Sequence, residues 1–261
     1  MLRALNTSAT GMAAQESNVN TISNNLANVN TVGFKQGRTE FEDLLYETVT
    51  EAGGRSSNNT QYNVGTQIGS GAKVSATRRI HAQGSTQVTN NPFDVMVNGD
   101  GFLGIIMPNN EVKFTRDGAF NPDAQGNMVN RNGYKLFPGI QVPSGTVRVN
   151  IAANGMVEAY LQGQVEPQQV GQIPIFTFTN EAGLRQEGGN LFGATSASGE
   201  AQQTAAGENN AGAIAQGMLE MSNVNVMNEM TNLIKAQRAY EMNSKVMGVA
   251  DQMLQTVNNI R

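Results

Sequence analysis

Few residues of this sequence have types and spacings that could carry out chemistry, and the first of them form a glycine-rich string. Residues 99–104, Gly-Asp-Gly-Phe-Leu-Gly, match the G-x-G-x-x-G pattern of dinucleotide-binding proteins, in which glycines let a helix N-terminus approach a pyrophosphate. That chemistry requires a helix directly after the glycines. Here residues 105–107 continue as a strand and residues 108–110, Pro-Asn-Asn, turn it. The string therefore predicts glycines in a hairpin rather than a nucleotide site.

The remaining candidates for a metal or catalytic site are equally incomplete. Residues 121–126 imitate the start of a calcium loop, but the twelfth position is Asn132, where a bidentate glutamate is required. His81 is the single histidine, and no plausible nucleophile lies near it in the sequence. Methionines crowd residues 218–253 at helical spacings, which favours packing between helices over a methionine-rich metal site. We therefore predict no catalytic residue, no metal site and no cofactor.

The composition excludes whole classes of site. The 261 residues include no cysteine, which removes thiol catalysis, zinc ribbons, iron–sulfur clusters and disulfides. The chain has 17 basic and 21 acidic residues and no arginine-rich block, so a nucleic-acid partner is not expected. Charged residues make up only 15% of the chain, and neutral amides supply much of its polar surface. Such a surface suits a chain that packs against other chains.

The first thirty residues predict one amphipathic helix. Apolar residues recur there at spacings of three, four and seven, and the pattern ends before Gly33, where glycine is a natural helix stop. The polar face is unusual, because Arg3 and Glu16 are the only charged residues before Lys35. The apolar stripe consists of Leu2, Leu5, Ala9, Met12, Val19, Ile22, Leu26 and Val29.

The C-terminal end predicts a second and longer helix. Apolar residues follow one another there at unbroken seven-residue intervals, which is typical of a coiled coil: Leu219, Val226, Leu233, Tyr240, Met247 and Leu254. Since the two helices stand at opposite ends of the chain with β structure predicted between them, each is the obvious partner of the other. We expect a hairpin-like pair of unequal lengths, in which the amide face of the first helix is left for neighbouring subunits.

The middle of the chain predicts short strands, because between residues 74 and 192 the hydrophobic period changes from 3.6 to 2. Asn132-Gly133 and Asn154-Gly155 each separate two such strands, and this dipeptide is a strong hairpin signal because both central residues of the tight turn need positive φ. The predicted fold class is therefore α+β. Long N- and C-terminal helices pair as a coiled-coil-like unit, and an extended connector leads to a central antiparallel β-rich domain.

The predicted boundaries follow changes in composition. Two stretches rich in Gly, Ser and Asn, residues 53–71 and 196–212, are read as connecting segments. No apolar stretch of 18 residues occurs, and no signal-peptide core is recognisable near the N-terminus, so neither membrane insertion nor a cleaved leader is expected. The five segments are 1–35 (N-terminal helix), 36–72 (extended connector), 73–195 (β-rich domain), 196–213 (linker) and 214–261 (C-terminal helix).

Two sequence signatures resemble those of a known family. Residues 23–35, Ser-Asn-Asn-Leu-Ala-Asn-Val-Asn-Thr-Val-Gly-Phe-Lys, are similar to the N-terminal signature of bacterial flagellar rod and hook proteins. Residues 222–226, Ser-Asn-Val-Asn-Val, followed by residues 237–243, Gln-Arg-Ala-Tyr-Glu-Met-Asn, resemble the matching C-terminal signature. Within this family, the chain length and residues 41–46 look most like the subunits of the distal rod. A hook protein would carry an additional large β domain.

The resemblance implies a non-enzymatic building block that polymerises helically into the drive shaft crossing the periplasm and transmits torque to the hook. It also implies uncleaved export through the flagellar type III export apparatus. The implied partners are further copies of the chain, proximal rod subunits, hook and hook-cap proteins, and the P and L ring proteins. The alternatives are a proximal rod paralogue, a secreted β-domain adhesin and a wall-associated hydrolase.

Periodicity and the resemblance together select the interface residues. The expected subunit-interface residues are Leu5, Met12, Val19, Asn24, Asn25, Leu26, Asn28, Val226, Leu233, Tyr240, Met247 and Leu254. The connector residues expected to dock on another surface are Phe41, Leu44, Leu45 and Tyr46. Buried amides are costly unless paired, so we expect the asparagines to hydrogen bond across subunits. Isolated helices of this kind are marginal in water, so the termini are expected to be loosely held in the monomer.

Overall fold

The computed structural model describes residues 2–53, 55–57, 60–61, 63–163, 166–209 and 211–259. The chain divides into two compact units. The first, here called the helical unit, contains residues 1–27, 37–79 and 225–261. The second, here called the β domain, contains residues 28–36 and 80–224. The predicted α+β class is confirmed, because one helix stands at each end of an antiparallel, strand-rich middle.

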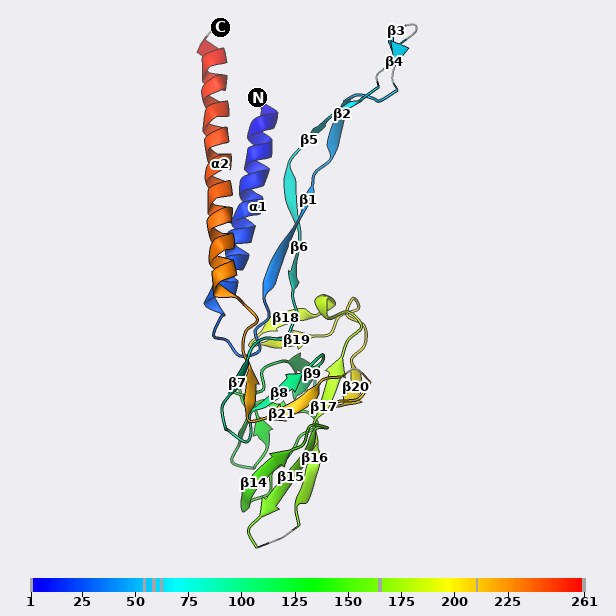
Figure 1. Cartoon of the computed structure of the whole chain (residues 1–261), viewed down its shortest axis with the longest axis vertical. Coiled ribbons are helices and arrows are strands. Elements are labelled where there is room, and N and C mark those ends of the chain that lie inside the picture. Colours follow the sequence, from blue (N-terminus) through cyan, green and yellow to red (C-terminus); the bar gives the residue numbers. More distant parts are fainter. Residues whose placement is uncertain are drawn as a thin grey trace. The chain divides into compact units, whose positions relative to one another are not determined.

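The helical unit is built on two helices, α1 (Leu2–Ala27) and α2 (Val226–Asn259), which lie side by side and antiparallel (Figure 1). Two contacts fix their register: Gly11 lies against the Asn243 side chain, and Asn25 donates to Glu229. The helices have 26 and 34 residues, so α2 extends past the start of α1. Neither is long and apolar enough to cross a membrane.

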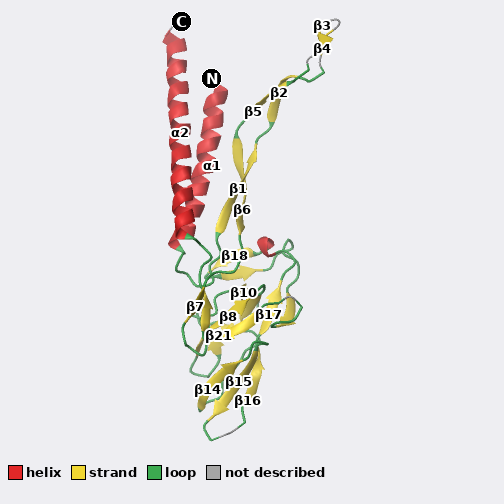
Figure 2. Ribbon diagram, viewed as in Figure 1, coloured by secondary structure: helices red, strands yellow, loops and turns green. Residues whose placement is uncertain are grey.

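A two-stranded ribbon completes the helical unit (Figure 2). Its strand pairs are β1 (Gly37–Asp43) with β6 (Ala72–Arg79), β2 (Tyr46–Thr50) with β5 (Thr66–Gly69), and β3 (Arg55–Ser57) with β4 (Thr60–Gln61). The ribbon packs along α1, where Thr39 donates to Thr21 at 2.8 Å and Gly71 lies against Thr10. The segment expected as a connector is therefore extended and paired with itself. Residues 54, 58, 59 and 62 of that segment lie outside the described residues.

The β domain is antiparallel throughout its described pairs. Its strands are β7 (Thr86–Val88), β8 (Val95–Asn98), β9 (Phe102–Ile106), β10 (Val112–Thr115), β11 (Asn121–Pro122), β12 (Met128–Val129), β13 (Lys135–Leu136), β14 (Thr146–Ile151), β15 (Met156–Leu161), β16 (Gln168–Gln172), β17 (Pro174–Thr177), β18 (Arg185–Gly188), β19 (Leu191–Gly193), β20 (Gln202–Ala205), β21 (Ala213–Gln216) and β22 (Met218–Glu220), with a 3₁₀ turn at Glu181–Gly183. The largest sheet runs β11-β12-β13-β9-β10-β19-β18, and β17 joins β9 to β20. A second sheet is β14-β15-β16, while β21 pairs with β8 and β22 with β7.

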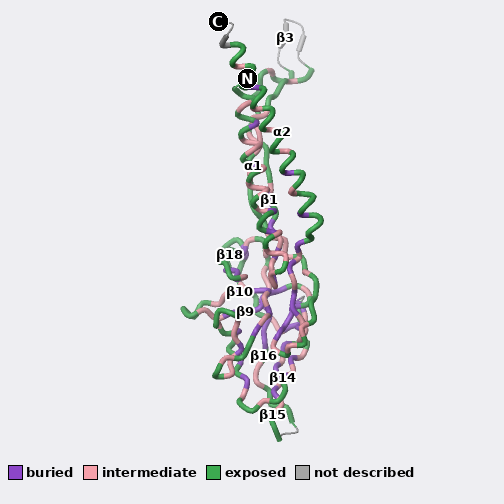
Figure 3. Tube along the Cα trace, turned by 90° about the vertical axis from the view of Figure 1, so that its left-hand side faces the viewer, coloured by how far each residue is buried: buried purple, intermediate pink, exposed green. Residues whose placement is uncertain are grey.

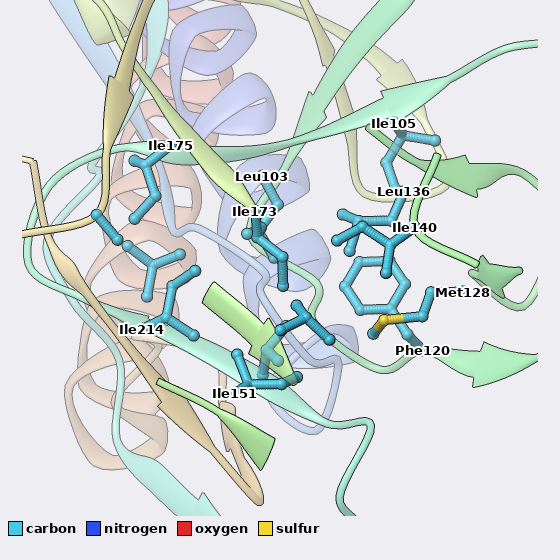
Figure 4. Packing of buried hydrophobic residues seen from close by; sticks show 14 of the residues in the cluster. Leu103, Ile105, Phe120, Met128, Leu136, Ile140, Ile151, Ile173, Ile175 and Ile214 are labelled. Atoms are coloured by element: carbon cyan, nitrogen blue, oxygen red, sulfur yellow. The ribbon is translucent and has the colours of Figure 1, made fainter. Parts of the chain in front are cut away.

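Strand β9 shows how the core of the β domain forms. Its side chains alternate, so Leu103 and Ile105 enter an aliphatic cluster while Phe102 enters an aromatic one. Both faces of β9 are buried, which explains its continuous apolar run. Figure 4 shows the aliphatic cluster, and Figure 3 shows that buried residues gather in this domain.

The glycine string, residues 99–104, runs from the turn before β9 into that strand and serves this packing. Gly99 and Gly101 have φ of 112° and 119° in the turn between β8 and β9. A Cβ on Gly104 would lie 2.6 Å from the ring of Phe176. Only glycine therefore leaves room for this ring to pack against the backbone of β9. Strand β9 begins within the string and ends at Ile106, so the chain continues as a strand, as predicted, where a pyrophosphate site would need a helix.

The two Asn-Gly hairpins form where predicted but with a different turn. Strands β12 and β13 pair across Asn132-Gly133, and β14 and β15 pair across Asn154-Gly155. In each dipeptide only the glycine has positive φ, 81° at Gly133 and 85° at Gly155. The glycine N–H donates to the carbonyl three residues earlier, as in a type I turn followed by a glycine bulge. The expectation of positive φ at both residues was therefore wrong.

The C-terminal helix begins later than predicted. Residues 213–216 and 218–220 form β21 and β22, so Leu219 belongs to the β domain and not to the heptad series of α2. Gly217, with φ of 72°, turns the chain between these strands. The Asn225 side chain accepts from the Asn228 N–H at 3.2 Å, which caps the helix at Val226. The expected linker also contains a strand, β20, which pairs with β17.

Candidate subunit interface

One side of α2 packs against α1 within the helical unit. Buried or half-buried residues recur on this side at intervals of three and four, which is the spacing of a coiled-coil seam: Glu229, Leu233, Ala236, Ala239, Asn243, Met247, Ala250 and Leu254. The fully buried apolar members are alanines. Small residues let the two backbones approach closely, so this contact with α1 buries little of the apolar surface of α2.

A second seam lies on an exposed side of α2. Met242, Val246, Val249 and Met253 follow one another at intervals of four, three and four, and their exposed fractions lie between 49% and 61%. Met227, Met230 and Ile234 are exposed nearer the start of the helix. A helix that is apolar on more than one side is typical of one buried by more than one neighbour. We call these seven residues, the four of the seam together with the three about a quarter turn away from it on the helix, the exposed α2 face.

The predicted interface residues fall into several environments. On the N-terminal side, Leu5, Met12, Val19, Leu26 and Asn28 are half-buried, Asn24 is exposed and Asn25 is buried. On the C-terminal side, Leu233, Met247 and Leu254 are half-buried along the seam with α1, while Val226 and Tyr240 are exposed. The exposed α2 face was missed by the sequence reasoning. Its signal, a second heptad series offset from the first, was present in the sequence.

Asn25 finds its hydrogen-bond partners inside the helical unit. Its Nδ2 donates to Glu229 Oε2 at 3.0 Å and to the Gly37 carbonyl at 2.8 Å, and its Oδ1 accepts from the Gly37 N–H at 2.8 Å. One side-chain amide thus ties α1 to both α2 and β1. Both of its N–H groups are used within this chain, which meets the requirement that a buried amide be paired.

The connector residues lie on the ribbon. Phe41, Leu45 and Tyr46 are exposed, and Leu44 is half-buried with its N–H donating to the Gly71 carbonyl at 2.9 Å. Val49, Val64 and Ile68 are exposed on the same ribbon. The ribbon therefore presents apolar side chains that remain partly or largely exposed in the described part of the helical unit.

The β domain contains a buried cluster of charges. Lys35 Nζ lies 2.7 Å from Glu220 Oε1, Arg116 Nη1 lies 3.3 Å from Glu220 Oε2, and all three side chains are 1% exposed. Glu220 also accepts from the Gly84 N–H at 2.9 Å, and Lys35 donates to the Ala82 carbonyl at 2.9 Å. Burial lowers the pKa of Lys35, the Arg116 charge acts in the same direction, and Glu220 opposes both.

The two family-like signatures meet around this cluster. The Gly33 N–H donates to the Glu220 carbonyl at 2.7 Å, and a Cβ on Gly33 would lie 2.6 Å from a backbone nitrogen. Asn223 Oδ1 accepts from the Gln36 N–H at 2.7 Å, while its Nδ2 donates to the Ile80 and Ala82 carbonyls. We call Gly33, Lys35, Arg116, Glu220 and Asn223 the signature junction. It joins residues 28–36 to residues 218–224 within the β domain.

The other candidates have structural roles. The Asp123 carboxylate accepts from the N–H groups of Gln125 and Asn127 and from the Asn127 side chain, so it closes a turn. The His81 ring packs edge-on against Phe102 and Phe192, with centroids 5.5 and 5.6 Å apart. Asp123 and His81 thus contribute to the fold of the β domain.

Comparison with known proteins decides the family. Three family models match: "Flagella basal body rod protein" over residues 5–35, "Flagellar hook protein FlgE/F/G D1 domain" over residues 96–159, and "Flagellar basal body rod FlgEFG protein C-terminal" over residues 215–260. The flagellar basal-body rod protein FlgG of Caulobacter vibrioides is 47% identical over 261 residues, covering 100% of both chains. This chain belongs to the flagellar basal-body rod protein family. FlgG of Borreliella burgdorferi and FlgG of Bacillus subtilis are 45% and 35% identical, each over 99% or more of both chains.

The three matched ranges include some of the features described above and leave out others. Each of the three models contributes one charged residue to the signature junction: Lys35 from the first, Arg116 from the second and Glu220 from the third. The exposed α2 face lies within the C-terminal rod model. The ribbon, residues 37–79, lies outside all three matched ranges.

Proposed function

We propose that this rod-family protein is a structural, non-enzymatic subunit of the distal rod of the bacterial flagellar basal body. Its copies polymerise helically, and the polymer crosses the periplasm and transmits torque to the hook. The subunit is exported without a cleaved leader by the flagellar type III apparatus. Its partners are further copies of itself, proximal rod subunits, hook and hook-cap proteins, and the P and L ring proteins.

The exposed α2 face is the observation that carries this proposal. Its second heptad series has the spacing that receives another helix, and its side chains remain half exposed after α1 has packed. Burying the exposed remainder of such a Val or Met side chain contributes about 1 kcal/mol, so this face contributes several kcal/mol to each subunit contact. A surface of this kind is a liability in a monomer and a binding site in a polymer.

The remaining interface residues extend the same contact. We propose that the half-buried Leu5, Met12 and Val19 of α1, together with its exposed amide residues, face neighbouring copies in the polymer. We further propose that Phe41, Leu45 and Tyr46 dock the ribbon on a neighbour, which stiffens the rod. Deleting residues 46–65 is expected to leave assembly intact but to change rod straightness, and an unchanged rod removes the assignment.

Polymerisation of the purified full chain tests the function directly. Concentrated wild-type protein is expected to form open helical tubes by electron microscopy, and closed rings contradict the proposal. The double variant Val246→Asp/Val249→Asp places charge on the exposed α2 face and is expected to abolish tube formation while leaving monomer unfolding unchanged. Val147→Asp, at an exposed valine of β14, is the matched control and should form tubes. Tube formation by the double variant at wild-type concentration refutes the interface.

The non-enzymatic assignment has a separate test. Incubation of the protein with peptidoglycan is expected to release no muropeptides above a protein-free blank. Release that scales with protein concentration would favour the hydrolase alternative.

A further inference from the structure

Four of the seven side chains on the exposed α2 face are thioethers. Met227, Met230, Met242 and Met253 have exposed fractions of 75%, 42%, 61% and 50%. The chain also holds methionines with the opposite environment, because Met128 is 0% exposed in the aliphatic core of the β domain. The exposed thioethers are therefore concentrated on the surface whose apolar character the assembly needs.

We propose that these four methionines are an oxidation site that switches assembly off. The proposal rests on the polymerisation proposed above. The oxidant is a peroxide: the sulfur lone pair attacks one peroxide oxygen, the O–O bond breaks, an S=O bond forms, and the other oxygen leaves as water. The sulfur is oxidised by two electrons and the peroxide is reduced by two. A thiol-dependent sulfoxide reductase reverses the step, since two thiols become a disulfide and the oxygen leaves as water.

Oxidation of these methionines weakens assembly because of where they lie on α2. A sulfoxide is a polar hydrogen-bond acceptor. Next to Val246 and Val249 in the covered seam, it would lose its bound water without gaining a hydrogen-bond donor. Met242 and Met253 occupy two of the four positions of the exposed heptad series, so oxidation affects both ends of that seam. Once a neighbour covers the seam, peroxide no longer reaches the sulfur. The modification thus acts on unassembled chains, and assembly protects against it.

Graded peroxide treatment of the full-length monomer tests the selectivity of the site. Peptide mass spectrometry is expected to show Met227 and Met242 oxidised at least about tenfold faster than Met128 and Met96, both of which are buried. The same peroxide applied to assembled tubes is expected to leave Met242 and Met253 reduced. Equal rates for exposed and buried methionines in the monomer, or equal rates in monomer and tube, overturn the proposal.

Polymerisation after oxidation tests the switch. The critical concentration of the oxidised wild type is expected to rise at least about tenfold and to return after treatment with a sulfoxide reductase and dithiol. The matched control replaces all four residues, Met227→Leu/Met230→Leu/Met242→Leu/Met253→Leu, which keeps apolar volume and removes the sulfur. It is expected to polymerise equally with and without peroxide. Unchanged assembly of the oxidised wild type, or loss of assembly in the treated control, overturns the switch.

The failure of this proposal is distinguishable from the failure of the proposed function. Untreated wild type that forms no tubes contradicts the rod-subunit function and with it the switch. Untreated wild type that forms tubes, and whose oxidised form also does, contradicts only the switch.

Discussion

The helical unit and the β domain bury different kinds of side chain. Among the described residues, the buried apolar side chains of the helical unit are Ala14, Ile22, Ala236 and Ala250. The β domain buries two clusters of large aliphatic and aromatic residues. The helical unit instead leaves many of its large apolar residues exposed on α2 and on the ribbon. The β domain thus obtains its stability from its own core, whereas the helical unit keeps apolar surface for other molecules.

Both units also bury polar side chains, but the charges of these side chains differ between the units. The helical unit buries the hydrogen-bonded pair of Asn25 and Glu229. In the β domain the Glu220 carboxylate is buried between two cations, Lys35 and Arg116. Removing the single anion of a buried cluster leaves like charges unpaired, so the β domain depends on Glu220 more than the helical unit depends on any one of its polar groups.

The largest expected effect is that of Glu220→Gln on the β domain. The amide still accepts from the Gly84 N–H, but it leaves the buried Lys35 and Arg116 cations without their carboxylate. We expect the free energy of unfolding to fall by about 3–5 kcal/mol. Urea unfolding of the full chain, followed by near-ultraviolet circular dichroism of the aromatic cluster, measures it.

Two further variants control that experiment. Glu187→Gln removes a carboxylate that also serves two cations, Lys113 and Arg185, but at a partly exposed site, and its cost should be about 0–1 kcal/mol. Lys35→Met added to Glu220→Gln is expected to recover part of the loss because one of the two like charges that remain in the cluster is removed. Equal costs for the two glutamates would show that burial does not set the importance of this junction.

Hydrogen exchange compares the two units within one molecule. In dilute monomer, amides of α1 and α2 are expected to exchange at least about 100-fold faster than those of β9 and β17, because the helical unit has little core of its own. In assembled tubes the helices should become protected. Strong protection of residues 5–28 in dilute monomer would contradict the expectation that the termini order on assembly.

A smaller effect is expected from Asn25→Ala in the helical unit. The change removes one hydrogen bond to the buried Glu229 and two to the Gly37 backbone, and it should cost about 1–3 kcal/mol in opening of α1. Hydrogen exchange of α1 amides reports this opening. Asn20→Ala, at an exposed site of the same helix, should change it by less than about 0.5 kcal/mol. A similar response from both variants would count against a special role for Asn25.

The smallest expected effect is a pH dependence from Lys35. Its pKa in the folded protein lies below the ordinary 10.5, so between the two values the unfolded chain binds more protons than the folded chain. The contribution of Lys35 to the free energy of unfolding therefore rises with pH up to about 10.5. The difference in stability between wild type and Lys35→Met isolates this contribution when it is measured from neutral to alkaline pH. A difference that falls over this range contradicts the lowered pKa.

Periodicity predicted the elements better than their ends. Both helices, the strand-rich middle and the two Asn-Gly hairpins follow from local patterns of apolar and turn residues. The start of α2 did not follow from such a pattern. Leu219 keeps the seven-residue spacing, but it lies in β22, which pairs with β7. Pairing with a distant strand decided that segment, and a local pattern contains no information about such a partner.

The sequence by itself determined that this chain has a helix with apolar stripes at each end, few charges and no cysteine chemistry, since these follow from residue types and their spacing. Only the tertiary structure decided which side of α2 meets α1 and which side is left for another molecule. An apolar repeat shows only that one side of a helix is apolar. Packing decides which neighbour covers that side. The junction depends on tertiary structure for the same reason: Lys35 meets its counter-ion 185 residues away, a pairing that chain folding alone brings about.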